Sequence, residues 1–400
     1  MSSLNLKSNI IWTILSKALI LALNLAVVVM TTQLWGADGR GAVAIFVADL
    51  SIVSIFANVF TGSSVSYFFS RIGTSKLATA AYIWSFVTAA AGGVAVRCSG
   101  QTATAPLLFA AAALSGLLAF HNSLFVGGQK ISHYNLVTVM QPALLLAGMF
   151  LLHRLAPGIG YYCYFFAQIA SIGIILLVCR RLRRNMGVRL RWDFDRACNR
   201  QMLSFGWKTE LSSLLQFFNY RLAYYLLGYF ACRASVGVFS IGVMAAEAIW
   251  IVSRSMSMVQ FSNVLRQGDT PQSRKETLSL SWISLGVSAA CVAVLSLLPS
   301  SFYAFVFGPE FGEVGRVICW LAPGILAIAF SNVIGNYFSA IRDLNILIVK
   351  SAVGLVFTVA LSFWLIPKWQ ITGACVVNSV SYVMSSLVLI LHYVLRAPKP

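Results

Sequence analysis

The sequence NIIWTILSKALILALNLAVVVMTT at residues 9–32 decides the class of fold. Most positions in this stretch are apolar, and only Lys17 carries a charge. A helix needs about 20 apolar residues to cross a bilayer, so the stretch is long enough to span the membrane once. The same composition continues along the chain, since 59% of the 400 residues are hydrophobic and only 10% are charged. Ordinary soluble domains are about 25% charged, so a water-soluble enzyme is excluded.

Twelve apolar segments are long enough to span the membrane. Each is expected to be a helix, because lipid offers no hydrogen-bond partners to an open strand. They lie at 9–32, 42–69, 77–96, 106–127, 135–152, 160–179, 203–230, 237–262, 277–306, 316–340, 346–366 and 371–395. One long polar stretch, 180–200, divides them six and six. The sequence therefore predicts an all-α polytopic membrane protein with six-helix bundles at 1–180 and 203–400, joined by a basic cytoplasmic linker at 181–202.

Basic residues are distributed unevenly over the loops between these segments. Of the 29 Lys and Arg residues, 18 fall in one set of alternate loops and 6 in the other. Loops rich in Lys and Arg stay in the cytoplasm, so we expect the first set and both chain termini on that side. The net charge of +18 would suggest nucleic acid in a soluble domain. Here the charge follows membrane topology, and no nucleic-acid partner is expected.

The two halves of the sequence resemble each other weakly. Trp12 and Asn24 recur as Trp207 and Asn219, both 195 residues later. The first and seventh segments both enter from the cytoplasmic side, so such a repeat preserves orientation. This pattern predicts parallel repeats about an axis along the membrane normal, which is a known plan for transporters.

Several kinds of chemistry are missing from the sequence. There is no GxxxxGK[ST] loop for ATP, and the eight cysteines show no CxxC spacing for a metal. We therefore expect no cofactor, no metal and no catalytic residue. The outer loops are short, which counts against a membrane polysaccharide polymerase or ligase because such an enzyme usually needs a larger outer loop to hold its acceptor. The protein is not expected to be an enzyme.

Charged side chains within the apolar segments are the strongest functional signal. A charge at the centre of a bilayer costs about 2.5–3.5 kcal/mol on insertion scales, so it normally faces a partner or a wet cavity. Eight ionisable residues lie in such positions: Lys17, Asp49, Lys208, Glu210, Arg221, Glu247, Arg254 and Lys350.

Helical spacing places some of these residues on common faces. Residues seven apart nearly coincide in angle on a helix with 3.6 residues per turn. Lys17 and Asn24 share a face in this way, and so do Glu247 and Arg254 with Trp250 between them. These stripes have the pattern of cavity walls. For Lys17 and Arg254 we favour the cavity, because no unpaired acid within the segments is an obvious partner for them.

Two interpretations stay open for Arg221 and Glu247. They form either an ion pair that joins two helices or part of a cavity wall. The eight charges comprise five bases and three acids. A cavity with a basic excess suits an anionic ligand such as a pyrophosphate, which Arg binds in a bidentate manner and Lys as a point charge. The candidate substrate-binding residues are Lys17, Asn24, Arg221, Trp250 and Arg254, and the candidate ion-coupling acids are Asp49 and Glu247.

Four motifs resemble those of a known transporter family. The polysaccharide flippases carry an outer turn of the form L-G-P-x-G-x-G after the first span, a signature at the start of the second half, and two signatures in late spans. The corresponding stretches here are Leu34-Trp35-Gly36-Ala37-Asp38-Gly39-Arg40-Gly41, Asn219-Tyr220-Arg221-Leu222, Leu321-Ala322-Pro323-Gly324 and Leu365-Ile366-Pro367. Their order and spacing cover essentially the whole chain. The flippases belong to a superfamily that also contains the multidrug and toxic-compound extruders (MATE).

The resemblance implies movement of undecaprenyl-pyrophosphate-linked oligosaccharide units across the bacterial inner membrane. The units would be O-antigen or exopolysaccharide repeats, and the mechanism would be alternating access. The implied partners are this lipid-linked glycan, membrane lipids, and polysaccharide polymerase and chain-length proteins. A cation-coupled multidrug extruder of the same fold is the main alternative, and a membrane polymerase or ligase is a weaker one.

Overall fold

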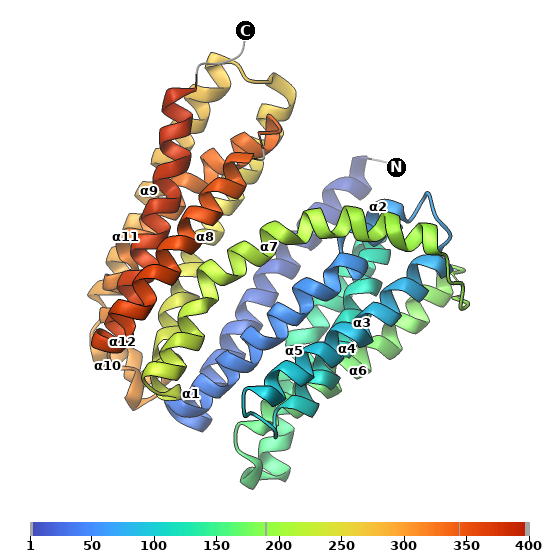
Figure 1. The fold of residues 1–400 in the computed structure, drawn as a ribbon, viewed down its shortest axis with the longest axis horizontal. Helices are drawn as coiled ribbons and strands as arrows, with labels where there is room; N and C mark the ends of the chain where they lie inside the picture. Colours follow the sequence, from blue (N-terminus) through green and yellow to red (C-terminus); the bar gives the residue numbers. More distant parts are fainter. Residues whose placement is uncertain (1–2, 189, 344, 397–400) are drawn as a thin grey trace. The chain divides into compact units, whose positions relative to one another are not determined.

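The structure is a computed structural model that describes residues 3–188, 190–343 and 345–396 (Figure 1). Within these residues the elements are α-helices and two short 3-10 turns, with no strand. Both chain ends, which we expect in the cytoplasm, lie outside the described residues, and so does the side chain of Lys208. Packing divides the chain into two compact units. Unit 1 is Met1–Trp35 with Ile45–Leu214, and unit 2 is Gly36–Ala44 with Leu215–Pro400.

The helices of unit 1 come mainly from the first half of the chain. They are α1 (Ser3–Thr61), α2 (Ser63–Phe68), α3 (Thr74–Cys98), α4 (Ala105–Gly127), α5 (Ile131–Leu155), the turn η1 (Pro157–Ile159), α6 (Tyr162–Asn185) and the first part of α7 (Arg196–Phe230). The remainder of α7 belongs to unit 2. Unit 2 continues with α8 (Arg233–Gln267), α9 (Pro271–Leu297), α10 (Ser300–Phe307), the turn η2 (Pro309–Phe311), α11 (Val314–Ala340) and α12 (Asn345–Leu395).

Helices of the described chain occupy the positions of the twelve expected spans. Nine stretches of the described chain are helical, long and apolar enough to cross a membrane. Two of these contain a break in helical geometry: α1 at Gly36 and α12 at Gln370, so each corresponds to two expected spans. The 35-residue helix α7 occupies the expected seventh span. With α7, which is not one of the nine, the described helices cover all twelve expected segments of an all-α, multi-pass membrane protein.

Glycines shape the break in α1 and its packing in unit 2. Gly36 has a φ of 61°, a left-handed conformation that favours glycine. The carboxylate of Glu310 accepts a hydrogen bond from the backbone N–H of Ala37, which follows the break. A Cβ at Gly41 would overlap the carbonyl oxygen of Arg233, and a Cβ at Gly237 would overlap that of Ala37. Gly36 is therefore required by its backbone conformation, and Gly41 and Gly237 by close helix approach.

Small and polar side chains let the helices pack closely within each unit. Lipid is as apolar as Leu, so membrane helices associate through close packing and hydrogen bonds. In unit 1, a Cβ at Gly116 of α4 would meet Ser85 of α3. In unit 2, α11 packs against α8, α9 and α12. The face of α9 at this packing carries buried Ser and Thr residues, and Ser284 donates a hydrogen bond to the carbonyl of Ala329 on α11.

The connector between α6 and α7 is shorter than the expected linker at 181–202. Helix α6 continues to Asn185, because its arginines are good helix formers, and α7 begins at Arg196. Asp195 caps α7 by accepting hydrogen bonds from the backbone N–H groups of Ala197 and Cys198. The same carboxylate lies 2.7 Å from the ammonium of Lys76 on α3, and this hydrogen bond holds the pKa of Asp195 below its usual value. The connector is thus fixed to unit 1, whose packing extends to Leu214.

Candidate functional site

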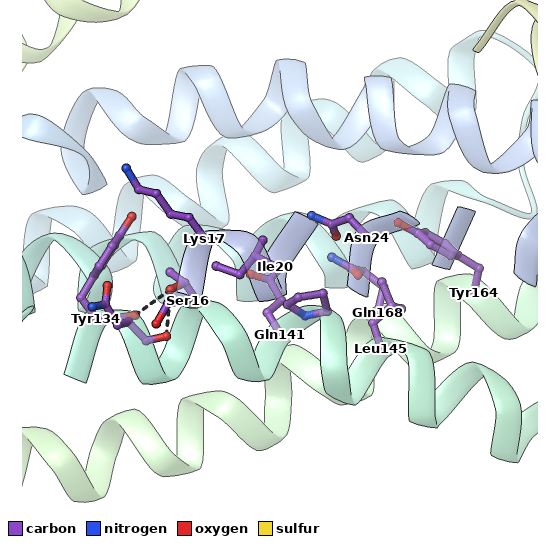
Figure 2. Close-up of a pocket in the computed structure, with 12 residues that line it drawn as sticks. Ser16, Lys17, Ile20, Asn24, Tyr134, Gln141, Leu145, Tyr164 and Gln168 are labelled. Carbon is purple, nitrogen blue, oxygen red and sulfur yellow. Dashed lines mark hydrogen bonds between the residues drawn. The ribbon is translucent and has the colours of Figure 1, made fainter. Parts of the chain in front are cut away.

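A polar cavity of about 420 Å³ lies in unit 1, between the first half of α1 and the helices α5 and α6. Lys17 and Asn24 both line it, as their seven-residue spacing predicts. Figure 2 shows Lys17 and Tyr134 toward one end of the cavity, and Asn24 with Gln168 toward the other. The cavity therefore brings together two of the predicted substrate-binding residues and adds polar groups from α5 and α6.

A second polar cavity of about 410 Å³ lies beside the first in unit 1. The second half of α1 contributes Asn58 to its wall, and α4 contributes Asn122. Gln141, Tyr164 and Gln168 line both cavities, so the two share a wall. Among the described residues that line either cavity, Lys17 is the only charged side chain. The described walls of the two cavities are therefore polar and carry one positive charge.

An apolar groove of about 890 Å³ continues along the same pair of helices, α1 and α5. Its walls are largely hydrophobic and include Leu25, Met30 and Phe150. His153 and Arg154, in the last turn of α5, also line it. On α1 the two spaces overlap in sequence, since Ala22 lines the groove and Asn24 lines the first polar cavity. The same two helices of unit 1 thus line both a polar space and an apolar space.

Asp49, a predicted coupling acid, is buried in unit 1 with 9% of its surface exposed. It lies on the second half of α1, where its neighbours Val47 and Leu50 line the second cavity. Asp49 is not itself among the lining residues. The structure therefore places this acid beside the polar space but not on its wall.

In unit 2 the structure brings Arg221 and Glu247 together. A guanidinium nitrogen of Arg221 on α7 lies 2.7 Å from the carboxylate of Glu247 on α8. A second nitrogen donates a hydrogen bond to the hydroxyl of Tyr224. The side chains of Arg221 and Glu247 are 27% and 35% exposed, so the ion pair is accessible. Of the two interpretations that the sequence left open, the structure shows the pair.

Aromatic rings cluster on the same helices, and the guanidinium of Arg221 lies over the ring of Tyr224. The ring of Tyr220 contacts those of Trp250 and Tyr382, and Trp250 also contacts Tyr382. Trp250 is 1% exposed, and its indole N–H donates a hydrogen bond to the carbonyl of Ile325 on α11. Trp250 therefore contributes to the packing of α8 on α11. Arg254, one turn further along α8, is exposed.

The predicted site residues thus fall into two groups. Lys17, Asn24 and Asp49 belong to unit 1, while Arg221, Glu247, Trp250 and Arg254 belong to unit 2. A search for charges missed the carboxamides of the polar cavities, which are Asn58, Asn122, Asn135, Gln141 and Gln168. An amide within an apolar helix is the signal that could have found them. Among the described residues, no group of three His, Cys, Asp or Glu side chains could hold a metal ion.

Comparison with known proteins gives the family. A family model described as "Polysaccharide biosynthesis protein" matches residues 41–279, more than half of the chain. The chain belongs to this family. The family predicted from the sequence motifs is thereby confirmed. No curated protein matches the chain.

Solved structures show the fold of this polysaccharide biosynthesis protein. A multidrug resistance MATE family transporter of the MOP superfamily has a TM-score of 0.74 at 14% identity, covering 94% of this chain and 93% of the other. The lipid II flippase MurJ has a TM-score of 0.66 at 13% identity, covering 96% and 86%. A MATE transporter of Vibrio cholerae has a TM-score of 0.63 at 14% identity, covering 96% and 94%. The chain therefore has a MATE-like fold over nearly its whole length.

Proposed function

We propose that this protein is a flippase for undecaprenyl-pyrophosphate-linked oligosaccharide units. It would move an O-antigen or exopolysaccharide unit from the cytoplasmic to the periplasmic leaflet of the bacterial inner membrane by alternating access. The family assignment supports a role in polysaccharide biosynthesis. The MATE-like fold, which a flippase of lipid II also has, supports transport rather than catalysis.

The observation that carries the proposal is that the same two helices of unit 1, α1 and α5, line both a polar cavity and an apolar groove. The polar cavities suit a hydrophilic head, and the apolar groove between α1 and α5 suits a hydrocarbon chain. A lipid-linked glycan contains both parts covalently joined. Binding would bury the chain against apolar walls, at about 25 cal/mol for each Å² removed from water. A soluble polar substrate would leave the groove unused.

The candidate residues receive specific roles in this mechanism. Lys17 would offer a point charge to the pyrophosphate beside the polar cavity, and Arg154 lines the apolar groove beyond it. Arg221 and Arg254 would attract the anionic group in unit 2. A contact of Arg221 with phosphate requires the ion pair to Glu247 to open, so Glu247 would become available for a proton or cation at the same step.

Orientation and partners complete the proposal. Both termini would lie in the cytoplasm, because the basic loops fall on that side of the span map. Reporter fusions after Arg71, Lys130 and Arg266 should then all give cytoplasmic activity, and two periplasmic results would overturn the map. The unit delivered to the periplasm would pass to a polysaccharide polymerase and its chain-length protein.

The experiment is export in a flippase-deleted strain, with the amount of membrane protein measured alongside. Wild-type protein should restore surface polysaccharide. Lys17→Ala should reduce export and Lys17→Arg should retain most of it, because only the charge is needed at this position. Lys130→Ala is the matched control, since Lys130 is exposed at the start of α5 and lines neither cavity. Full export by Lys17→Ala at normal expression would contradict the role of Lys17.

A multidrug extruder of the same fold is the second candidate, because a multidrug MATE transporter shares the fold with a TM-score of 0.74. The two functions differ in the substrate moved. Vesicles reconstituted with the purified protein should expose a labelled undecaprenyl-pyrophosphate glycan at the opposite leaflet. Accumulation of a cationic dye without movement of the glycan would favour the extruder.

A further inference from the structure

We propose that unit 1 contains a binding site for an uncharged sugar residue, of the hexose or N-acetylhexosamine class, which discriminates against uronic acids. The inference rests on the proposed function and names the glycan that it would carry. The site is the carboxamide chamber, which we define as the two polar cavities lined by Asn24, Asn58, Asn122, Asn135, Gln141 and Gln168.

The chamber is assembled from distant parts of the sequence. Asn24 and Asn58 come from the two halves of α1, and Asn122 comes from α4. Gln141 on α5 and Gln168 on α6 line both cavities, as part of the wall that the cavities share. Four helices therefore present amide groups to two adjacent cavities. The two cavities, of about 420 and 410 Å³, lie in the usual size range of sites for small ligands.

Carboxamides suit the groups that a neutral sugar displays. Each amide offers one oxygen acceptor and two N–H donors, so it can bond to neighbouring hydroxyls that both donate and accept. An acetamido group has a carbonyl acceptor and an N–H donor, so a carboxamide side chain can bond to it in the same way. Hydroxyl side chains of Tyr134, Thr138 and Ser54 add further partners of this kind to the walls.

Two of these amides have unused acceptors. Gln168 is only 7% exposed, and its side-chain oxygen is buried without a hydrogen-bond partner among the described residues. The side-chain oxygen of Asn122 is likewise buried and unpartnered within the described chain. Buried polar atoms are normally paired, and exceptions call for an explanation. Two hydroxyls of a bound sugar would satisfy these oxygens by donating one hydrogen bond to each.

The charge of the chamber sets its selectivity. None of the described lining residues is acidic, and the single base, Lys17, is exposed and lies toward one end. A uronate would leave its hydration shell and find only neutral partners in the interior of the chamber, which is unfavourable. A cationic ligand would meet no carboxylate on the walls. An uncharged sugar loses the least hydration free energy when it enters the chamber.

The test measures binding of methyl glycosides to the purified full-length protein in lipid nanodiscs, with ligand-observed NMR as the detection method. The probes are methyl glucoside, methyl N-acetylglucosaminide and methyl glucuronoside. We expect the two neutral glycosides to bind at least tenfold more tightly than the glucuronoside. Gln168→Leu should weaken neutral binding at least tenfold. Gln201→Leu is the control, because Gln201 is an exposed helical carboxamide of unit 1 away from the chamber.

A second variant keeps the proposal testable if Gln168→Leu fails to fold. Gln141 is half-buried and lines both cavities, so a longer side chain is easier to accommodate there. Gln141→Lys places a positive charge in the chamber, and it should raise affinity for the glucuronoside while lowering that for the neutral glycosides. Unchanged selectivity in a folded Gln141→Lys protein would refute the assignment.

Three further results would overturn the inference: equal affinity for neutral and acidic glycosides, wild-type binding by Gln168→Leu, and stabilisation by Na⁺ without any glycoside binding. The proposed function is tested separately in reconstituted vesicles. If Gln168→Leu binds glycosides normally and flips the lipid-linked glycan at the wild-type rate, the chamber assignment fails and the flippase stands. If wild-type protein binds neutral glycosides but flips no glycan, the flippase fails and the chamber stands.

Discussion

The ion pair between Arg221 and Glu247 predicts a measurable energetic coupling within unit 2. The charged atoms are 2.7 Å apart, and the side chains are 27% and 35% exposed. Exposed pairs contribute about 0–1 kcal/mol, whereas removal of one partner from a buried pair costs about 3–5 kcal/mol. This pair lies between the two limits because solvent reaches about a third of it. We therefore expect a coupling free energy of about 1–3 kcal/mol.

A double-mutant cycle measures this coupling. Arg221→Gln, Glu247→Gln and the double variant are compared by thermal unfolding of the purified protein in detergent. Each single variant should be less stable than the wild type, and the double variant should be more stable than the sum of the two losses predicts. Glu313 and Arg316 form the control pair, because their side chains are 68% and 71% exposed and their coupling should be close to zero.

Additive losses at Arg221 and Glu247, within about 0.5 kcal/mol, would refute the ion pair. Export separates stability from transport. Arg221→Lys keeps the charge but loses the planar group that reaches both Glu247 and Tyr224. The variant should therefore fold normally but export polysaccharide poorly. Wild-type surface polysaccharide from Arg221→Ala at normal protein level would contradict any role of Arg221 in substrate binding, although the fold would stand.

Two further predictions follow from geometry outside the cavities. Gly237→Ala should lower the melting temperature sharply, because the added Cβ would overlap the backbone carbonyl of Ala37. Gly173→Ala on α6 is the control, since a Cβ there contacts nothing and the change should be neutral or stabilising. Equal melting temperatures for the two variants would refute the close approach at Gly237. Cys232 lies in an expected outer loop, so it should react with a membrane-impermeant maleimide from the periplasmic side. The Ser235 hydroxyl and backbone N–H lower the pKa of the Cys232 thiol, so this reaction should persist below the usual thiol pH range. Cys98, also exposed in an expected outer loop, controls for access, and protection of Cys232 in intact spheroplasts would contradict its outer position.

Much of the fold could be predicted because the bilayer imposes a simple rule on the sequence. An apolar run of about 20 residues must become a helix, and that rule gave all twelve spans. The rule does not reveal that the first two spans form one helical element, α1, or that the last two form another, α12. The break at Gln370 has a positive φ at a residue other than glycine, which no local preference indicates. Nor does it show that Gly36–Ala44 packs with unit 2, because that depends on contacts with residues far along the chain.

The candidate site could be predicted only in part, because helical spacing describes one helix at a time. The spacing of Lys17 and Asn24 correctly placed both on one cavity wall. The same spacing grouped Trp250 with Arg254 on α8, yet α11 covers Trp250 and leaves Arg254 exposed. Gln168 carries no charge and no periodic signal. Its importance depends on which residues of α1, α4 and α5 lie around it.

A count of charges over the spans overstated the basic character of the site. The excess of bases predicted a cationic cavity, but the structure pairs Arg221 with Glu247, and Lys17 is the single charge among the described residues that line the polar cavities. Most polar groups on these described walls are therefore amides and hydroxyls. A lipid-linked glycan needs both kinds of contact, since its pyrophosphate is anionic and its sugars expose hydroxyls. In the proposed mechanism the carboxamide chamber would recognise the sugars, which vary between glycans, while Lys17 would bind the pyrophosphate that all of them share.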